Sequence, residues 1–91
     1  MLPRYDVVLL PDAERALEKL STGDRRAAQR IAATLRALAS DPRPSGIRAL
    51  VGAPGQLRIR VGDYRIVYLI EDSRLIVTVI RIGHRREVYR R

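Results

Sequence analysis

The chain contains no cysteine, no tryptophan and no phenylalanine, and it has a single histidine. Without cysteine it cannot form a disulfide, a thiolate metal site or a cysteine nucleophile. A transition-metal site would have to combine His84 with carboxylates alone, a ligand set that suits hard cations better. We therefore expect neither a metal nor another cofactor.

Long apolar runs are also missing. No stretch approaches the roughly 18 apolar residues of a membrane span, and the N-terminus lacks the charged, apolar and small-residue segments of a signal peptide. A chain of 91 residues is long enough for one sheet and two or three helices. We expect a single domain over residues 1–91, located in the cytoplasm and without membrane contact.

Positive charge is what the chain has in excess. Its formal net charge is +8, and 17 of its 18 cationic residues are arginine. From Gln56 onward there are nine arginines against four acids. Such a surplus predicts a polyanionic partner, bound through phosphate neutralisation and counterion release. The C-terminal part is the expected binding surface.

The first half of the chain predicts a strand followed by two helices. Residues 4–10 alternate and then run apolar, as a strand does. Pro11 and Asp12 open a short helix that ends near Leu20, because proline and acids are favoured in the first helical turn. A longer helix is expected over residues 24–39, in an antiparallel hairpin with the first. Four arginines, which we interpret as its solvated face, are Arg25, Arg26, Arg30 and Arg36.

The second half predicts a loop and a sheet. Residues 40–55 are rich in proline and glycine and should be mostly loop. Three strands follow at about 56–61, 64–71 and 74–82, with a type II′ turn at Gly62-Asp63 and another tight turn at Asp72-Ser73. The chain should leave the sheet at Gly83. The fold class is therefore α+β: an N-terminal strand, an antiparallel two-helix hairpin packed on a small sheet completed by a three-stranded antiparallel meander, and a short C-terminal tail.

The stretch QLRIRVGDYRIVY places three arginines close together. A two-residue turn pairs Arg60 with Arg65 and Arg58 with Val67, and directly opposed residues share a face. Opposed like charges are unfavourable, and the guanidinium fork suits phosphate oxygens, which together favour a bound anion. The alternative is a solvated sheet face. Apolar residues expected on the same face, where they would suit a partner segment, are Val67, Leu69, Ile76 and Ile80. Those expected to face the helices are Leu57, Ile59, Val61, Ile66, Tyr68 and Ile70.

The tail supplies the remaining chemical groups. His84, Arg85, Arg86 and Tyr89 follow one another closely after the last predicted strand. Isolated histidines and tyrosines are usually structural, but a tyrosine beside a phosphate site can also stack on a base. Both interpretations are open for His84 and Tyr89.

The motifs LRIRVGDYRIVY and VIRIGHRREVY resemble the RelE/ParE superfamily of bacterial toxins, which belong to type II toxin-antitoxin pairs, and are most similar to the RelE branch. The resemblance extends over nearly the full length. It implies a metal-independent ribonuclease that cuts messenger RNA in the ribosomal A site, where the ribose 2′-hydroxyl attacks the neighbouring phosphate. Carried over by position, it implies that Arg58, Arg60, Arg65 and Arg85 act on the phosphate and that Tyr89 stacks on the nucleotide. The implied partners are the ribosome with its mRNA and a cognate antitoxin, through which alone DNA is contacted.

One departure from the family concerns proton transfer. The best known relatives have lysines where this chain has Arg58 and Arg60, and arginine is a poor general base because it stays protonated. Histidine as a residue type titrates near neutrality. We therefore hypothesise that His84 takes part in proton transfer and that Arg85 acts as acid or phosphate clamp.

Two other functions fit the same sequence. A ParE-like toxin would inhibit DNA gyrase by protein contact and would need no ribonuclease residues. A non-catalytic nucleic-acid-binding module is consistent with the charge, although the chain shows no recognisable RNA-binding or helix-turn-helix signature.

Overall fold

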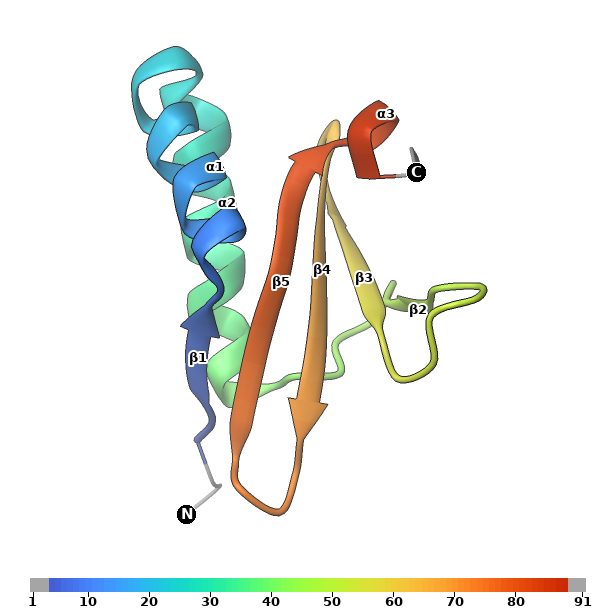
Figure 1. The fold of residues 1–91 in the computed structure, drawn as a ribbon. Helices are drawn as coiled ribbons and strands as arrows, with labels where there is room; N and C mark the ends of the chain where they lie inside the picture. Colours follow the sequence, from blue (N-terminus) through green and yellow to red (C-terminus); the bar gives the residue numbers. More distant parts are fainter. Residues whose placement is uncertain (1–3, 89–91) are drawn as a thin grey trace.

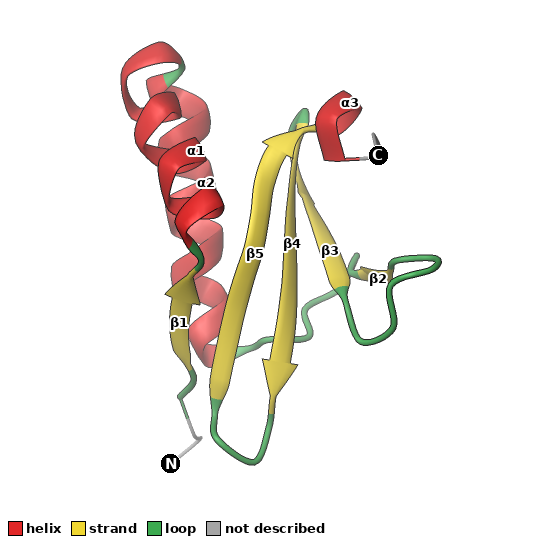
Figure 2. Cartoon of the chain, in the orientation of Figure 1, coloured by secondary structure: helices red, strands yellow, loops and turns green. Residues whose placement is uncertain are grey.

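The computed structural model describes residues 4–88, and side chains for residues 4–86. Within this range a five-stranded sheet carries a helical hairpin on one side and a short helix near its opposite face (Figures 1 and 2). The elements in chain order are β1 Asp6–Leu9, α1 Pro11–Gly23, α2 Arg25–Ser40, β2 Arg48–Ala49, β3 Leu57–Val61, β4 Tyr64–Glu71, β5 Ile76–His84 and α3 Arg85–Val88.

The strand order is β1-β5-β4-β3-β2. Strand β1 runs parallel to β5, and the other neighbouring pairs are antiparallel. The predicted α+β class, with a helical hairpin and an antiparallel meander, is confirmed. The place of the N-terminal strand, which the sequence does not specify, is the sheet edge beside β5.

Helix α1 continues three residues past its predicted end near Leu20, to Gly23. The hydroxyls of Ser21 and Thr22 donate hydrogen bonds to backbone carbonyls one turn earlier, at 2.5 and 3.1 Å, so both residues remain helical. Asp24 alone separates the helices, and its carboxylate caps α2 by accepting from a backbone amide at 3.2 Å. The hairpin itself is confirmed.

The core lies between the helical hairpin and one face of the sheet. Its buried members are Ala13, Ile31, Leu35 and Leu38 from the helices and Val61, Ile66, Tyr68, Val77, Val79 and Ile82 from the strands. The other strand residues that we expected on this face, Leu57, Ile59 and Ile70, are partly buried against the same cluster. The predicted division of the β3–β4 hairpin into a helix face and an arginine face is therefore confirmed.

The β3–β4 hairpin has the predicted register. Arg60 pairs with Arg65 and Arg58 pairs with Val67. Gly62 has a positive φ of 61°, whereas Asp63 does not share this conformation. Positive φ at the first turn position alone is the type II′ geometry, and it favours glycine there.

Strand β5 differs from its predicted range at both ends. It begins at Ile76 instead of residue 74, because Glu71 pairs with Ile76 and leaves a four-residue turn in which Leu75 has a φ of 54°. It also continues through Gly83 to His84, which pair with β4 and so stay in the sheet. The expected exit at Gly83 was wrong.

A β-bulge interrupts the pairing of β4 with β5. Val67 pairs with Arg81 and Tyr68 pairs with Val79, so Ile80 is the extra residue. A bulge shifts the alternation of side chains after it. Arg81 therefore lies on the face away from the helices. Without the bulge, the strict alternation of side chains along β5 would direct it toward the helices.

Residues 40–55, predicted to be mostly loop, contain the two-residue strand β2. Arg48 and Ala49 pair with Arg58 and Leu57 of β3. The long connection thereby adds a fifth strand to the sheet and a further arginine beside Arg58. Two residues carry almost no periodic signal, which is why the sequence did not reveal this strand.

Hydrogen bonds fix the start of the same loop. The Tyr68 hydroxyl donates to the carbonyl of Pro42 at 2.9 Å, and burial raises the pKa of Tyr68 to about 12. Arg43 donates twice to the Asp72 carboxylate, at 3.1 and 2.7 Å, and the Tyr5 hydroxyl donates to it at 2.6 Å. These bonds, that of Arg43 foremost, lower the pKa of Asp72 to about 2. The loop, β1 and the β4–β5 turn are thereby linked.

Candidate functional site

The β3–β4 turn brings two opposed arginines together. The Gly62 carbonyl accepts a hydrogen bond from Arg60 Nε at 3.4 Å and another from Arg65 Nη1 at 3.3 Å. Arg65 Nη1 also donates to the carbonyl of Tyr64 at 3.0 Å. The turn thus holds two guanidinium groups near each other in spite of their like charge.

Arg65 is more deeply placed than the sequence suggested. The residue is only 7% exposed, and it is the one buried charged residue in the described part of the chain. Its Nε is buried without a hydrogen-bond partner among the described atoms. An unsatisfied buried donor of this kind costs roughly 1–3 kcal/mol, so the burial of Arg65 Nε lowers the stability of the fold.

Arg85 joins the same turn from the C-terminal side. Its backbone amide donates to the carbonyl of Asp63 at 2.7 Å, which fixes the start of α3. Helix α3 lies near the end of the sheet, away from α1 and α2 (Figure 1). Three of the predicted site residues, Arg60, Arg65 and Arg85, are therefore attached to a single two-residue turn.

Arg58 lies two residues along β3 from Arg60, on the same face of the sheet. It pairs with Val67 on one side and with Arg48 on the other, and Val67 pairs in turn with Arg81. Arg48 and Arg81 were not among the predicted site residues. The bulge at Ile80 and the short strand β2 bring them to the arginine face, and neither feature has a signal in the sequence.

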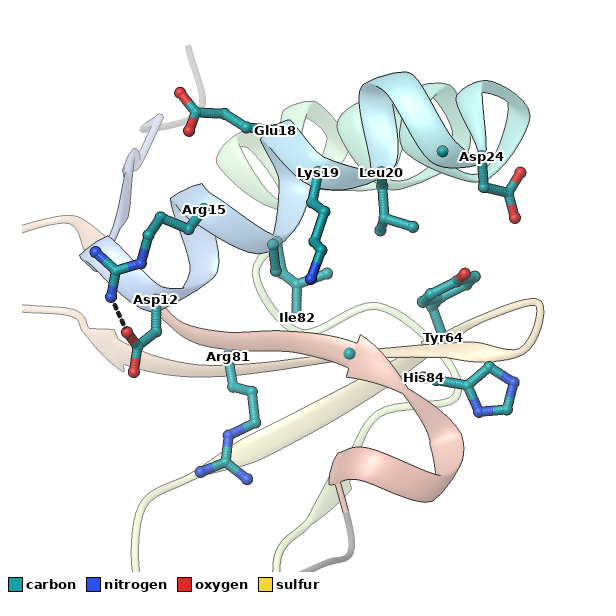
Figure 3. Close-up of a pocket in the computed structure, with 13 residues that line it drawn as sticks. Asp12, Arg15, Glu18, Lys19, Leu20, Asp24, Tyr64, Arg81, Ile82 and His84 are labelled. Carbon is teal, nitrogen blue, oxygen red and sulfur yellow. Dashed lines mark hydrogen bonds and ion pairs between the residues drawn. The ribbon is translucent and has the colours of Figure 1, made fainter.

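His84 lies on the opposite face of the sheet. It pairs with Tyr64, whose side chain faces the helices, and the two rings make an edge-to-face contact with centroids 5.7 Å apart. Figure 3 shows both rings at a groove of about 1100 Å³ beside α1. Arg81 also lines this groove, but its guanidinium extends away from α1. His84 Nδ1 accepts a hydrogen bond from the amide of Arg86 at 3.3 Å. The structure therefore does not bring His84 together with the arginines of the β3–β4 turn.

Two remaining tail residues are placed differently. Arg86 is exposed on α3. Tyr89, the predicted stacking residue, lies outside the described residues. Its role stays a prediction of the sequence.

The described residues offer little to a metal ion. Within residues 4–88, no three His, Cys, Asp or Glu side chains gather as metal ligands would. The helices of this range also fall short of the length and apolar character that a membrane span requires. What the surface offers is several guanidinium donors on one small area, which suits an anion with several oxygens.

Comparison with known proteins assigns this arrangement to a family. Residues 7–89 match the family model described as ParE toxin of type II toxin-antitoxin system, parDE. Toxin RelG of Mycobacterium tuberculosis is 40% identical over 37 residues, a match that covers 41% of this chain and 42% of RelG, so less than half of that curated relative.

Solved structures share the fold. The toxin-antitoxin complex RelBE2 from M. tuberculosis has a TM-score of 0.78 and 26% identity, with coverage of 92% of this chain and 94% of that chain. A mutant of the E. coli toxin RelE in the free state has a TM-score of 0.73 and 26% identity, with coverage of 94% and 90%.

Proposed function

We propose that this chain, which belongs to the ParE toxin family of type II toxin-antitoxin systems within the RelE/ParE superfamily, is a RelE-type toxin that cuts messenger RNA in the ribosomal A site. The observation that supports this proposal is the attachment of Arg60, Arg65 and Arg85 to one turn. Three cationic residues attached to one turn favour a phosphate-binding role over a role in protein contact alone.

The proposed reaction needs no metal. The ribose 2′-oxygen forms a bond to the neighbouring phosphorus, the bond from phosphorus to the 5′-oxygen breaks, and the 2′-hydroxyl proton leaves while the 5′-oxygen gains one. Negative charge accumulates on the phosphorane oxygens, and donors fixed where charge develops are the strongest electrostatic contribution to catalysis. Arg60 and Arg85 supply these donors, and Arg58 binds the adjoining backbone.

Arg65 contributes from beneath the surface. Because its Nη1 donates to the carbonyls of Gly62 and Tyr64, it holds the turn and thereby the direction of Arg60. Its positive charge stabilises the phosphorane from beneath the surface. The ribosome and Tyr89 hold the 2′-hydroxyl in line with the leaving oxygen, and such positioning alone accounts for a large part of a rate.

The general base is the least constrained part of the proposal. His84 remains the residue type best suited to move a proton near neutrality. Its ring, however, lies on the helix side of the sheet, so the 2′-hydroxyl would have to reach the end of β5 to use it. The alternative is that His84 acts through its hydrogen bond to the amide of Arg86, next to Arg85.

A cognate antitoxin is the second partner. The similar RelBE2 structure is a toxin-antitoxin complex, and we propose that an antitoxin segment folds over the open face of this sheet, with acids against the arginines. Any contact with DNA is made by the antitoxin within the complex. Because the proposed partners are the ribosome and an antitoxin, we propose that the protein acts in the cytoplasm.

A ParE-type function is the competing candidate, because the matching family model is described by that toxin. A ParE-type toxin inhibits DNA gyrase, and the arginine cluster would then be a protein-binding surface. The two candidates differ in what happens to messenger RNA.

The test is to map new RNA 5′ ends on translating ribosomes incubated with the purified protein. We expect new ends within the A-site codon for the wild type, and loss of these ends for the double variant Arg65→Ala with Tyr89→Ala. Because Arg65 is buried, the exposed Arg60→Ala provides a variant expected to keep the fold and to lose most cleavage. Arg36→Ala, an exposed arginine of α2, should cleave as the wild type does. Intact message together with inhibited gyrase would establish the ParE-type function instead.

A further inference from the structure

The arginines of the open sheet face lie in two rows that cross the strands. The first row is Arg60 on β3 and Arg65 on β4, which pairs with Gly83 on β5. The second row is Arg48, Arg58, Val67 and Arg81, one residue from each of the strands β2 to β5. Neighbouring strands are about 4.8 Å apart, so the second row spans about 14 Å of backbone, far more than one phosphate group needs.

The bulge at Ile80 is what completes the second row. Ile82 and Arg81 point to opposite sides of β5, Ile82 toward the helices and Arg81 away from them (Figure 3). Bulges are frequent next to functional sites because they redirect a side chain. Here the redirected side chain is a cation, and it is added to a row that already carries two.

Among the residues of β1, β4 and β5 that the structure describes, the rest of the open face has no comparable row of cations. Beyond the second row, Leu69 pairs with Thr78, and Thr78 with Val8. At the far end, Glu71 and Asp6 both pair with Ile76. The ion pairs among the described residues, Asp12–Arg15, Arg43–Asp72 and Glu71–Arg74, include neither Arg48 nor Arg81. Positive charge is therefore concentrated at the end of the sheet near the β3–β4 turn.

We propose that Arg48 and Arg81 bind the RNA backbone on either side of Arg58, so that a single strand crosses the sheet from β2 to β5. This inference rests on the proposed function and names residues that bind the nucleotides flanking the cleaved bond. Two residues along a strand advance the chain by about 7 Å, so the second row runs next to the cluster of Arg60, Arg65 and Arg85.

An RNA strand fits this row better than a protein segment does. Val67 is only 4% exposed, so the row presents guanidinium groups and almost no apolar surface. A backbone of regularly spaced phosphates matches a line of cations, whereas a peptide would need apolar contacts as well. Those apolar contacts lie beyond the row, at Leu69 and Ile80.

The test is the salt dependence of binding to a short single-stranded RNA that carries 2′-O-methyl groups and cannot be cleaved. Each phosphate contact contributes about 0.7 to the slope of log affinity against log salt concentration for single strands. We expect Arg48→Ala and Arg81→Ala each to lower the slope by about 0.7, and Arg81→Lys to retain it. Arg36→Ala, which removes the same charge from α2, should leave the slope unchanged.

A second measurement separates the row from the cleavage site. On ribosomes, Arg81→Ala should raise KM with little change in kcat, whereas Arg60→Ala should lower kcat. If Arg81→Ala leaves the slope unchanged while the wild type cleaves messenger RNA, the inference that the second row binds RNA is wrong, and the proposed function is unaffected. If Arg81→Ala reduces the slope but the wild type cleaves no messenger RNA on ribosomes, RNA binding by the second row is supported and the proposed function is wrong. If Arg81→Ala weakens antitoxin binding but not RNA binding, the row binds protein and the inference is wrong.

Discussion

Gly62 shows how much a single residue positions in this fold. Its carbonyl accepts from Arg60 and Arg65, and its positive φ closes the hairpin. A Cβ at this position would lie 3.0 Å from Nη1 of Arg30, which extends from α2 to the turn. Arg30, interpreted from sequence as merely solvated, therefore lies against the turn that carries the candidate site. A side chain at residue 62 would displace the guanidinium of Arg30 and would strain the turn, whose positive φ favours glycine.

His84 yields a prediction at the same scale. If it acts by accepting the amide hydrogen of Arg86 and so placing Arg85, His84→Ala should lower the single-turnover cleavage rate several-fold. His84→Asn should then restore most of the rate, because an asparagine oxygen can accept at the start of a helix. The measurement is single-turnover cleavage on ribosomes across a pH series.

The two roles of His84 give different pH profiles. Rescue by asparagine with an unchanged profile supports the positioning role. Failure of asparagine to rescue, with loss of the pH dependence near neutrality in both variants, would show that the imidazole itself moves the proton. An unchanged rate in His84→Ala would remove the histidine from the mechanism.

At the scale of elements, β5 decides the composition of both sheet faces. Before the extra residue Ile80, Val77 and Val79 point toward the core. After it, Ile82 points toward the core and Arg81 points away from it. Without the bulge, a cation would face the apolar core, at a cost of several kcal/mol unless it were paired. The bulge therefore keeps the core apolar and extends the cationic surface in one step.

The turn between β4 and β5 gives a prediction of pH dependence. The pKa of Asp72 is lowered to about 2 by its hydrogen bonds to Arg43 and Tyr5. A lowered folded-state pKa stabilises the fold above the unfolded value near 3.8, and this stabilisation disappears as the pH falls through about 2. Asp72→Asn should therefore be less stable than the wild type at neutral pH, and the difference should vanish between about pH 4 and pH 2.

Denaturant unfolding at a series of pH values measures this difference. Glu18→Gln, which removes an exposed carboxylate from α1, serves as the control and should keep the acid dependence of the wild type. A stability difference between Asp72→Asn and wild type that stays constant down to pH 2 would contradict the role of this carboxylate.

At the scale of the molecule, positive charge is concentrated at one end of the open face. Arginines occupy the end near the β3–β4 turn, and an apolar and threonine row follows. Asp6 and Glu71, the latter ion-paired with Arg74, lie at the opposite end. A partner that covers the whole face would meet guanidinium groups at one end and apolar side chains in the middle. This is the chemistry expected of an antitoxin segment with acids at one end and apolar residues beyond them.

We therefore predict that antitoxin binding is tight and strongly salt-dependent. Raising the salt concentration from about 50 to 200 mM should lower the affinity several-fold, mainly through the association rate. Arg60→Ala should reduce that salt dependence, whereas Ile80→Ala should weaken binding equally at every salt concentration, because it removes only apolar contact. Titration calorimetry at several salt concentrations measures both effects. An affinity that does not change with salt would rule out charge pairing as the basis of the complex.

The sequence alone determined those features that depend on neighbours along the chain. Apolar spacing identified both helices, and a two-residue turn fixed the register that places Arg58, Arg60 and Arg65 on one face. A two-residue turn allows few geometries, so this register followed from local chemistry.

Only the tertiary structure decided the burial of Arg65, the outward direction of Arg81 and the position of His84 on the helix side. It also decided the pairing of β1 with β5 and the existence of β2. Each of these depends on contacts between segments distant in sequence: a bulge, a two-residue strand and an edge pairing are set by the partner strand and by core packing. The alternation of residues within one strand cannot reveal these features, because their physical cause lies in another segment of the chain.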